Sequence, residues 1–139
     1  SSYNNVIADG TGEVYSMEGS ATDIEAIYIE KDYLAHANHY THPAMRRFEL
    51  DRSTIANSII RHNRAEYLLK ENYGKLTPDL FKSLLADHGG YPTSICKHGF
   101  NSVTVFSIIV QVETLTAWIG RGHPCETVYT EYKLEPYNK

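Results

Sequence analysis

Cysteine is scarce in this sequence, and its scarcity excludes a scaffold built on disulfides. The 139 residues include only two cysteines, Cys96 and Cys125. Two are too few for a disulfide framework, and they lack the paired C-x-x-C spacing that is typical of a zinc site. No metal site is predicted from them. Their small number favours a reducing compartment, so we expect a cytoplasmic protein.

Long apolar runs and basic clusters are also absent. The longest apolar stretch, VFSIIVQV at residues 105–112, is far shorter than the ~20 residues that cross a bilayer. The net charge is −4, and no run of Lys or Arg alternates with aromatic residues as a nucleic-acid-binding groove requires. The first residues, SSYNNVIADG, lack the basic and apolar regions of a secretory signal. Neither a membrane nor a nucleic acid is expected as a partner.

The composition that remains is typical of one folded domain. Hydrophobic residues make up 42% of the chain and charged residues 22%, which suits a globular protein of this length. Residues 3–8 and 13–19 have the composition of strands and flank the sequence DGTG, which is a hairpin signal. Residues 25–40 predict two further strands joined by a turn at Lys31 and Asp32. Four strands are therefore expected in this part.

A first helix is predicted after this group of strands. Isoleucines recur at helical spacing beyond Ser53, which can cap the helix, and Gly74 can end it. Basic residues on the opposite side are expected to face water: Arg61, Arg64 and Lys70.

The second half predicts one more helix and a second group of strands. Thr77 and Pro78 are typical of a helix start, as cap and first-turn residue. Three strands are expected in residues 103–112, 114–120 and 127–134. About seven strands and two helices predict an α+β fold with largely antiparallel strands. The first of these three strands is apolar on both faces and is expected to be covered on both.

An asparagine surrounded by histidines stands out in AHANHYTHP, residues 35–43. His36 and His39 are three residues apart, so in a strand they point to opposite faces, and no metal site is predicted there. By the same alternation His36, Asn38 and Tyr40 share one face. The Asn38 amide offers two N–H donors without a charge, as an oxyanion in acyl transfer requires. A simple turn-forming role for Asn38 is the alternative.

A second candidate pairs Cys96 with His98. Two residues apart on a strand they share a face, and a thiol nucleophile with a histidine base is conceivable. The alternative, which the sequence favours, is an inert buried cysteine. His88, Lys97 and Cys125 have no evident partner.

Several segments together resemble one known family. They are similar to the C-terminal part of the acyl-coenzyme A:6-aminopenicillanic acid acyltransferase family, which is related to the choloylglycine and penicillin V hydrolases among the N-terminal nucleophile (Ntn) hydrolases. The resemblance covers nearly the whole chain, residues 1–139, as the C-terminal portion of a single domain. The segments are SSYNNVIADGTGEVYSMEGS, AHANHY, RHNRAEYLL, LLADHGGYPTSICKH, TVFSIIVQVETLTAWIGRGHPCE and YTEYKL.

The resemblance implies a four-layer αββα fold and an autoprocessed precursor. An N-terminal cysteine would attack an amide or thioester carbonyl, and the α-amine of the same residue would act as base. Asn38 falls on the family's oxyanion-hole asparagine, while strand alternation suggests that His36 and Tyr40 line the substrate pocket. No cofactor is implied, although an acyl-coenzyme A is a possible substrate among small amide or acyl compounds.

Two departures from the family limit what is expected. The nucleophilic cysteine belongs to a portion before Ser1, so the chain is expected to be a fragment or subunit that is inactive without that partner. Asn101 and Ser102 stand near the place where the best known member has a substrate-side arginine, which leaves the substrate open. The rival hypothesis is a non-catalytic binding or assembly module that forms homo-oligomers through exposed sheet edges.

Overall fold

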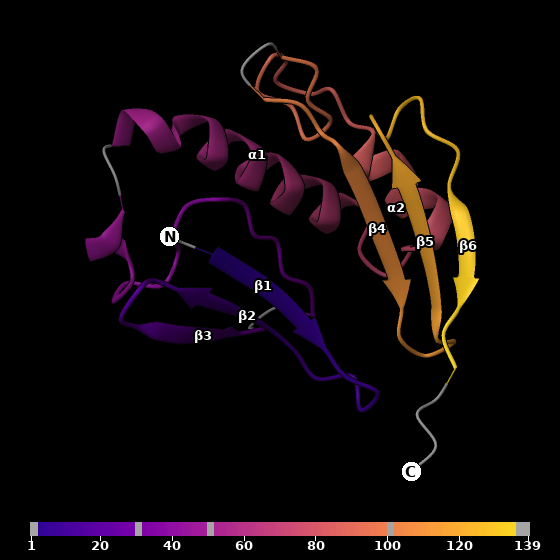
Figure 1. The fold of residues 1–139 in the computed structure, drawn as a ribbon, viewed down its shortest axis with the longest axis horizontal. Coiled ribbons are helices and arrows are strands. Elements are labelled where there is room, and N and C mark those ends of the chain that lie inside the picture. The colour runs from indigo at the N-terminus through magenta and orange to yellow at the C-terminus, as the bar shows by residue number, and fades with distance from the viewer. Residues whose placement is uncertain (1–2, 30–31, 50–51, 100–101, 136–139) are drawn as a thin grey trace. The chain divides into compact units, whose positions relative to one another are not determined.

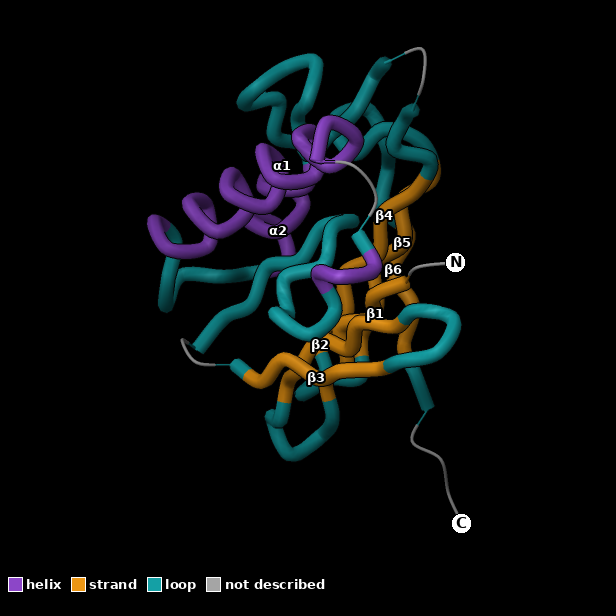
Figure 2. The backbone as a smooth tube through the Cα atoms, turned by 90° about the vertical axis from the view of Figure 1, so that its left-hand side faces the viewer, coloured by secondary structure: helices purple, strands orange, loops and turns teal. Residues whose placement is uncertain are grey.

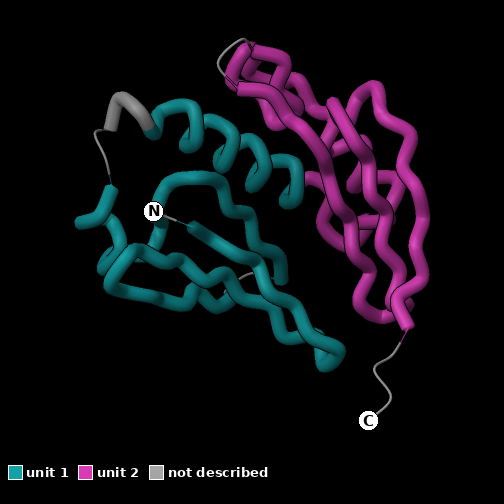
Figure 3. Tube along the Cα trace, viewed as in Figure 1, with its two compact units in different colours: residues 1–70 teal, residues 71–139 magenta. Residues whose placement is uncertain are grey.

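The computed structural model describes residues 3–29, 32–49, 52–99 and 102–135, without the side chains of residues 52–54. Within these residues it contains two α-helices and two antiparallel three-stranded sheets, which confirms the predicted α+β class (Figure 1). The chain divides into two compact units, residues 1–70 and 71–139 (Figure 3). In the described part of the chain, every helix is too short or too polar to cross a membrane.

The first unit is built on the sheet β1-β2-β3, with strands Tyr3–Ala8, Val14–Gly19 and Ile24–Tyr28. The predicted hairpin between the first two strands is confirmed. Its turn is closed by the Asp9 carboxylate, which accepts hydrogen bonds from Thr11, and by Gly12, whose φ of 88° suits glycine. Local turn chemistry therefore fixes the pairing of β1 with β2.

The prediction of a fourth strand within residues 33–40 is wrong. Beyond one bridge at Tyr33 this segment is an irregular loop (Figure 2). The backbone N–H groups at its C-terminal end bond to side chains instead of to a neighbouring strand. Ser58 accepts from the backbone of Asn38, and Glu49 accepts from the backbone of Tyr40 at 2.6 Å. Long-range side-chain acceptors thus replace the ladder that the strand pattern predicted.

Helix α1, Arg52–Glu71, follows a short 3₁₀ turn at Arg46–Phe48. The helix begins one residue before Ser53, so Ser53 lies inside the first turn and is not the predicted cap. After the helix, Gly74 adopts a φ of 72° in the turn that follows, as predicted.

Arg61, which was predicted to face water, does so only in part. Arg61 is half-buried on α1, and its guanidinium donates to the side chains of Asn57 and Asn38. Its head group donates to two polar acceptors, which helical periodicity does not show.

The second unit pairs helix α2, Pro78–Leu85, with the sheet β4-β5-β6. The strands are Phe106–Gln111, Thr116–Arg121 and Thr130–Lys133, so the described residues contain six strands rather than about seven. The predicted helix cap is confirmed because Thr77 Oγ1 accepts a hydrogen bond from the Leu80 N–H at 3.2 Å. The helix packs against β4.

Strand β4 is covered on one face and open on the other. Ser107 and Ile109 are buried, whereas Phe106, Ile108 and Val110 remain 57%, 50% and 51% exposed. The predicted burial of both faces is therefore not found within the described residues. Three large apolar side chains on one strand face are left in contact with solvent.

Candidate functional site

A single buried carboxylate organises the loop that carries Asn38. Glu18 lies on the central strand of the first sheet and is fully buried. It accepts hydrogen bonds from the backbone and hydroxyl of Thr41, at 2.6 and 2.7 Å, and from the backbone of His42 at 3.1 Å. His36 Nε2 contacts the same carboxylate at 2.5 Å. Glu18 thus holds both ends of the loop that contains Asn38.

Sequence reasoning missed Glu18. In the strand VYSMEG it falls on the same face as the small, buried Ser16. A carboxylate in phase with a buried residue is a signal that it has partners inside the protein, although the sequence does not say which.

His36 is fixed between two acceptors. Its Nε2 faces the Glu18 carboxylate, and its Nδ1 faces the carbonyl oxygen of Ala37 at 2.7 Å. An imidazolium, which carries N–H at both positions, satisfies both contacts. Burial raises the pKa of the Glu18 carboxyl, but hydrogen bonds from His36, Thr41 and His42 lower it by a larger amount. The pKa therefore lies below its usual range. The Glu18 carboxyl is therefore ionised at neutral pH.

Ser58 on helix α1 anchors the centre of the loop. Its Oγ accepts from the backbone N–H of Asn38 at 2.7 Å and from that of His39 at 3.0 Å, and it lies 2.8 Å from His39 Nδ1. Both backbone donors are thereby occupied. His36 faces Glu18 while His39 faces Ser58, so the two rings bond to different partners.

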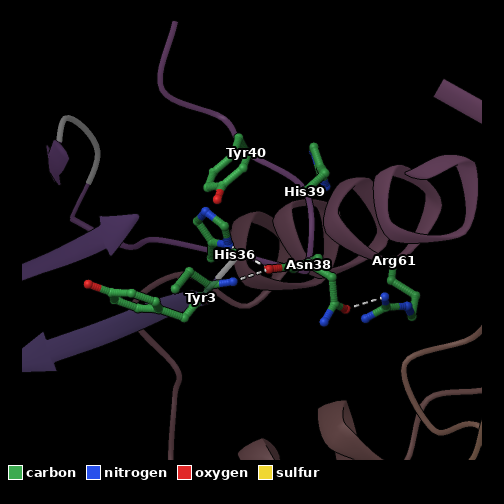
Figure 4. A pocket seen from close by; sticks show the side chains of 8 residues that line it. Tyr3, His36, Asn38, His39, Tyr40 and Arg61 are labelled. Carbon is green, nitrogen blue, oxygen red and sulfur yellow. Dashed lines mark hydrogen bonds between the residues drawn. The ribbon is translucent and has the colours of Figure 1, made fainter. Parts of the chain in front are cut away.

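The Asn38 side chain is oriented by Arg61. The guanidinium Nη2 donates to Asn38 Oδ1 at 2.5 Å, so the oxygen of the amide is turned to α1 and the NH₂ group is turned elsewhere (Figure 4). In the described part of the chain Nδ2 makes no hydrogen bond, and Asn38 is exposed. Two oriented N–H donors are therefore available to a ligand. Burial lowers the pKa of Arg61, but a guanidinium remains charged.

These side chains line a cavity of about 520 Å³ in the first unit (Figure 4). The three residues singled out from the sequence, His36, Asn38 and Tyr40, are brought together there. Tyr40 is buried, and its hydroxyl donates to the Gly19 carbonyl at 2.8 Å. The ring nitrogens of His36 are likewise bonded within the protein. Asn38 is the one of the three whose side chain keeps donors for a ligand among the described residues. The complete lining is Tyr3, Asn4, His36, Ala37, Asn38, His39, Tyr40 and Arg61.

His39 adds a neutral ring to the cavity wall. Burial lowers its pKa, and the neighbouring ring of His62, 5.3 Å away and nearly perpendicular, lowers it further. At neutral pH His39 is therefore uncharged, and Arg61 is the cation nearest to the Asn38 amide.

The second unit places Cys96 and His98 together, but in a setting that disfavours a nucleophile. Cys96 is fully buried, and its Sγ lies 3.4 Å from His98 Nε2. Burial raises the pKa of this thiol, whereas an activated nucleophile needs a lowered one. His88 and Cys125, which had no evident partner in the sequence, also meet His98.

The positions of the expected substrate-side residues are only partly described. Ser102 accepts a hydrogen bond from the Lys97 ammonium at 2.5 Å, whereas Asn101 lies outside the described residues. Lys97, which also lacked an evident partner in the sequence, thus contacts the neighbouring loop. No role in substrate binding follows from this contact.

Comparison with known proteins gives one family. The family model described as acyl-coenzyme A:6-aminopenicillanic acid acyl-transferase matches residues 1–125. No curated protein matches the chain.

Proposed function

We propose, for a chain that belongs to the acyl-coenzyme A:6-aminopenicillanic acid acyl-transferase family, that Asn38 stabilises the oxyanion of an acyl-transfer reaction at an amide or thioester bond. The observation that supports this most is the fixed orientation of its amide. Arg61 holds Oδ1, and Nδ2 of this cavity-lining residue has no partner among the described residues.

The surroundings suit a preorganised donor. Hydrogen bonds from the loop to Ser58 and to the buried Glu18 fix the loop before any substrate arrives, so little reorganisation is needed when charge develops. The Arg61 cation at Oδ1 polarises the amide and strengthens its N–H donors. A negative charge beside Nδ2 is also attracted by the guanidinium itself.

The nucleophile in this proposal is an N-terminal cysteine supplied by the portion of the precursor that precedes the chain. Its thiol loses a proton to the α-amine of the same residue and attacks the carbonyl carbon. The oxyanion that forms lies against Asn38 Nδ2. Collapse expels the amine or thiol, which takes up the proton, and leaves an acyl-thioester. Attack by water then gives hydrolysis, and attack by a second amine or thiol gives transfer.

The open face of β4 supports a missing partner. In the αββα arrangement that the family resemblance implies, a second sheet would cover Phe106, Ile108 and Val110. Their exposure on one strand face is what a domain with an absent portion would show. Both cysteines of the chain belong to the second unit, where they contact each other and His98.

The test is an alanine substitution at Asn38 in the enzyme reconstituted with its cysteine-bearing portion. Turnover of a panel of acyl-thioesters and amides should fall about 10²- to 10³-fold in kcat with little change in KM. Asn5→Ala, which removes an exposed asparagine from β1, is the matched control and should retain full activity. Unchanged kcat in Asn38→Ala contradicts the proposal, as does turnover by residues 1–139 alone.

The open β4 face also favours a second candidate, a non-catalytic assembly module that pairs with another copy. This candidate predicts a homo-oligomer in sedimentation experiments that dissociates in Ile108→Lys, with no turnover in any reconstituted mixture. A monomer, or activity after reconstitution, eliminates it.

A further inference from the structure

Two histidines and two cysteines converge in the second unit, outside the cavity described above. Their side chains come from separate stretches: His88, Cys96 and His98 follow α2, and Cys125 lies between β5 and β6. One nitrogen or sulfur atom from each residue lies within 4.8 Å of every other. The two sulfur atoms are 3.6 Å apart, and the two Nε2 atoms are 3.1 Å apart.

Hydrogen bonds to His98 do not account for the closeness of all four side chains. Three atoms approach the single Nε2 of His98: His88 Nε2 at 3.1 Å, Cys96 Sγ at 3.4 Å and Cys125 Sγ at 3.3 Å. An imidazole nitrogen carries either one proton or one lone pair, so it forms a good hydrogen bond with only one of these three neighbours. A disulfide does not describe the cluster either, because an S–S bond is about 2.05 Å long.

The spacing is instead that of ligands around one ion. Zinc binds cysteine sulfur at about 2.3 Å and histidine nitrogen at about 2.0–2.1 Å in tetrahedral geometry. A tetrahedron with these bond lengths has edges of about 3.8 Å between sulfurs, about 3.6 Å between sulfur and nitrogen, and about 3.4 Å between nitrogens. The four measured separations, 3.6, 3.4, 3.3 and 3.1 Å, lie within 0.3 Å of these edges.

We propose that His88, Cys96, His98 and Cys125 bind one Zn²⁺ ion. On binding, each thiol releases its proton to solvent, so the ion, two thiolates and two neutral imidazoles form a group without net charge. Soft sulfur donors with tetrahedral nitrogen favour zinc over magnesium, calcium or manganese. Four protein ligands leave no open position, so the ion has a structural role and not a catalytic one.

The surrounding backbone is suited to hold these ligands. The Cys96 N–H donates to the Asp87 carbonyl at 3.0 Å, and the Cys96 carbonyl accepts from Ser94 at 2.5 Å, so both sides of this buried ligand are fixed. The ring of His123 stacks on that of His98 at 3.9 Å and supports its orientation. The ion would tie the connection between α2 and β4 to the connection between β5 and β6. His88 and Cys125 are exposed, which gives the metal a route of entry.

Metal analysis of the purified protein tests the proposal without any assay of activity. Protein dialysed against ZnCl₂ and then against metal-free buffer should retain one equivalent of zinc. CoCl₂ in place of zinc should give the intense visible bands of tetrahedral cobalt and the charge-transfer band of cobalt–thiolate bonds. Cys125→Ser and His88→Ala should each weaken zinc binding by more than about 100-fold, because even the loss of outer contacts weakens metal sites 10- to 100-fold. His42→Gln, a histidine of the first unit, is the matched control and should keep the full equivalent.

Two measurements on the unaltered protein keep the test decisive if a variant fails to fold. X-ray absorption at the zinc edge should show two sulfur ligands at about 2.3 Å and two nitrogen ligands at about 2.0–2.1 Å. Intact mass should show both thiols reduced once the metal is removed. Oxygen-only coordination, less than a tenth of an equivalent of metal, or a mass two hydrogens lower from a Cys96–Cys125 disulfide would each overturn the proposal.

Discussion

The two units of this protein both gather polar side chains around an irregular segment, but they do so in opposite ways. In the first unit the Glu18 carboxylate accepts from His36, Thr41 and His42, and every contact joins a donor to an acceptor. In the second unit three atoms crowd a single nitrogen of His98, which can form a good hydrogen bond with only one of them. A cluster whose donors and acceptors are all paired, here called saturated, stabilises the fold. A cluster crowded around one nitrogen points instead to a bound ligand.

The largest effect should come from breaking the saturated cluster. Glu18→Ala removes a buried carboxylate and leaves His36 and two backbone N–H groups without their acceptor, so the free energy of unfolding should fall by roughly 3–5 kcal/mol. Urea denaturation measures the loss, and hydrogen exchange should accelerate in residues 34–42. Glu13→Ala, at an exposed position of the first hairpin, should change stability by less than about 0.5 kcal/mol. Equal effects of the two substitutions would mean that Glu18 is not an anchor.

The Glu18→Ala variant also tests whether the two units fold independently. Its zinc content should stay at one equivalent if the cluster of the second unit forms independently of Glu18. Loss of zinc together with loss of the loop would show that the two units do not behave as separate structures.

A smaller effect is expected at Ser58. Ser58→Ala leaves the backbone N–H groups of Asn38 and His39 without their acceptor, which should cost about 1–3 kcal/mol in stability. Activity of the reconstituted enzyme should fall as well, because the Asn38 amide loses its fixed position. Ser83→Ala on α2 removes a serine that bonds only to its own helix and should be nearly neutral. A Ser58 variant with wild-type kcat would show that the loop is held without it.

The smallest expected effect is a loss of stability in mild acid. Burial lowers the pKa of His39 and His62, so the folded first unit binds fewer protons there than the unfolded chain does. Stability should therefore decrease as the pH falls below about 6.5, and His39→Gln should reduce that slope. The Glu18 carboxyl, whose pKa is also lowered, stabilises the fold above its unfolded pKa and loses this effect only as the pH falls further. Urea titrations at several pH values measure both windows. An identical slope in His39→Gln would contradict the assignment.

Local signals made much of the fold predictable. The DGTG turn placed the first hairpin, Thr77 and Pro78 placed the start of α2, and segments of strand-forming composition placed the strands of the second sheet. The α+β class followed from their order. Each of these features depends on residues that are close together in the chain, where propensity and turn chemistry act directly.

The features that sequence reasoning missed depend on distant partners. The loop at 33–40 lost its predicted strand because Ser58 and Glu49 capture its backbone donors. Arg61 was assigned to water because periodicity does not show that Asn38 lies 23 positions away in sequence and 2.5 Å away in space. The sulfur atoms of Cys96 and Cys125, 29 residues apart, meet only through the folded second unit. No short-range pattern carries that information.

The attachment of the Asn38 loop to Glu18 has a mechanical consequence. One carboxylate contacts the chain on both sides of Asn38, so the two flanks of the loop stay together. A shift of β2 should therefore tilt the whole loop, with its amide, rather than stretch it. The orientation and position of the Asn38 side chain thus depend on β2, a strand that does not line the cavity.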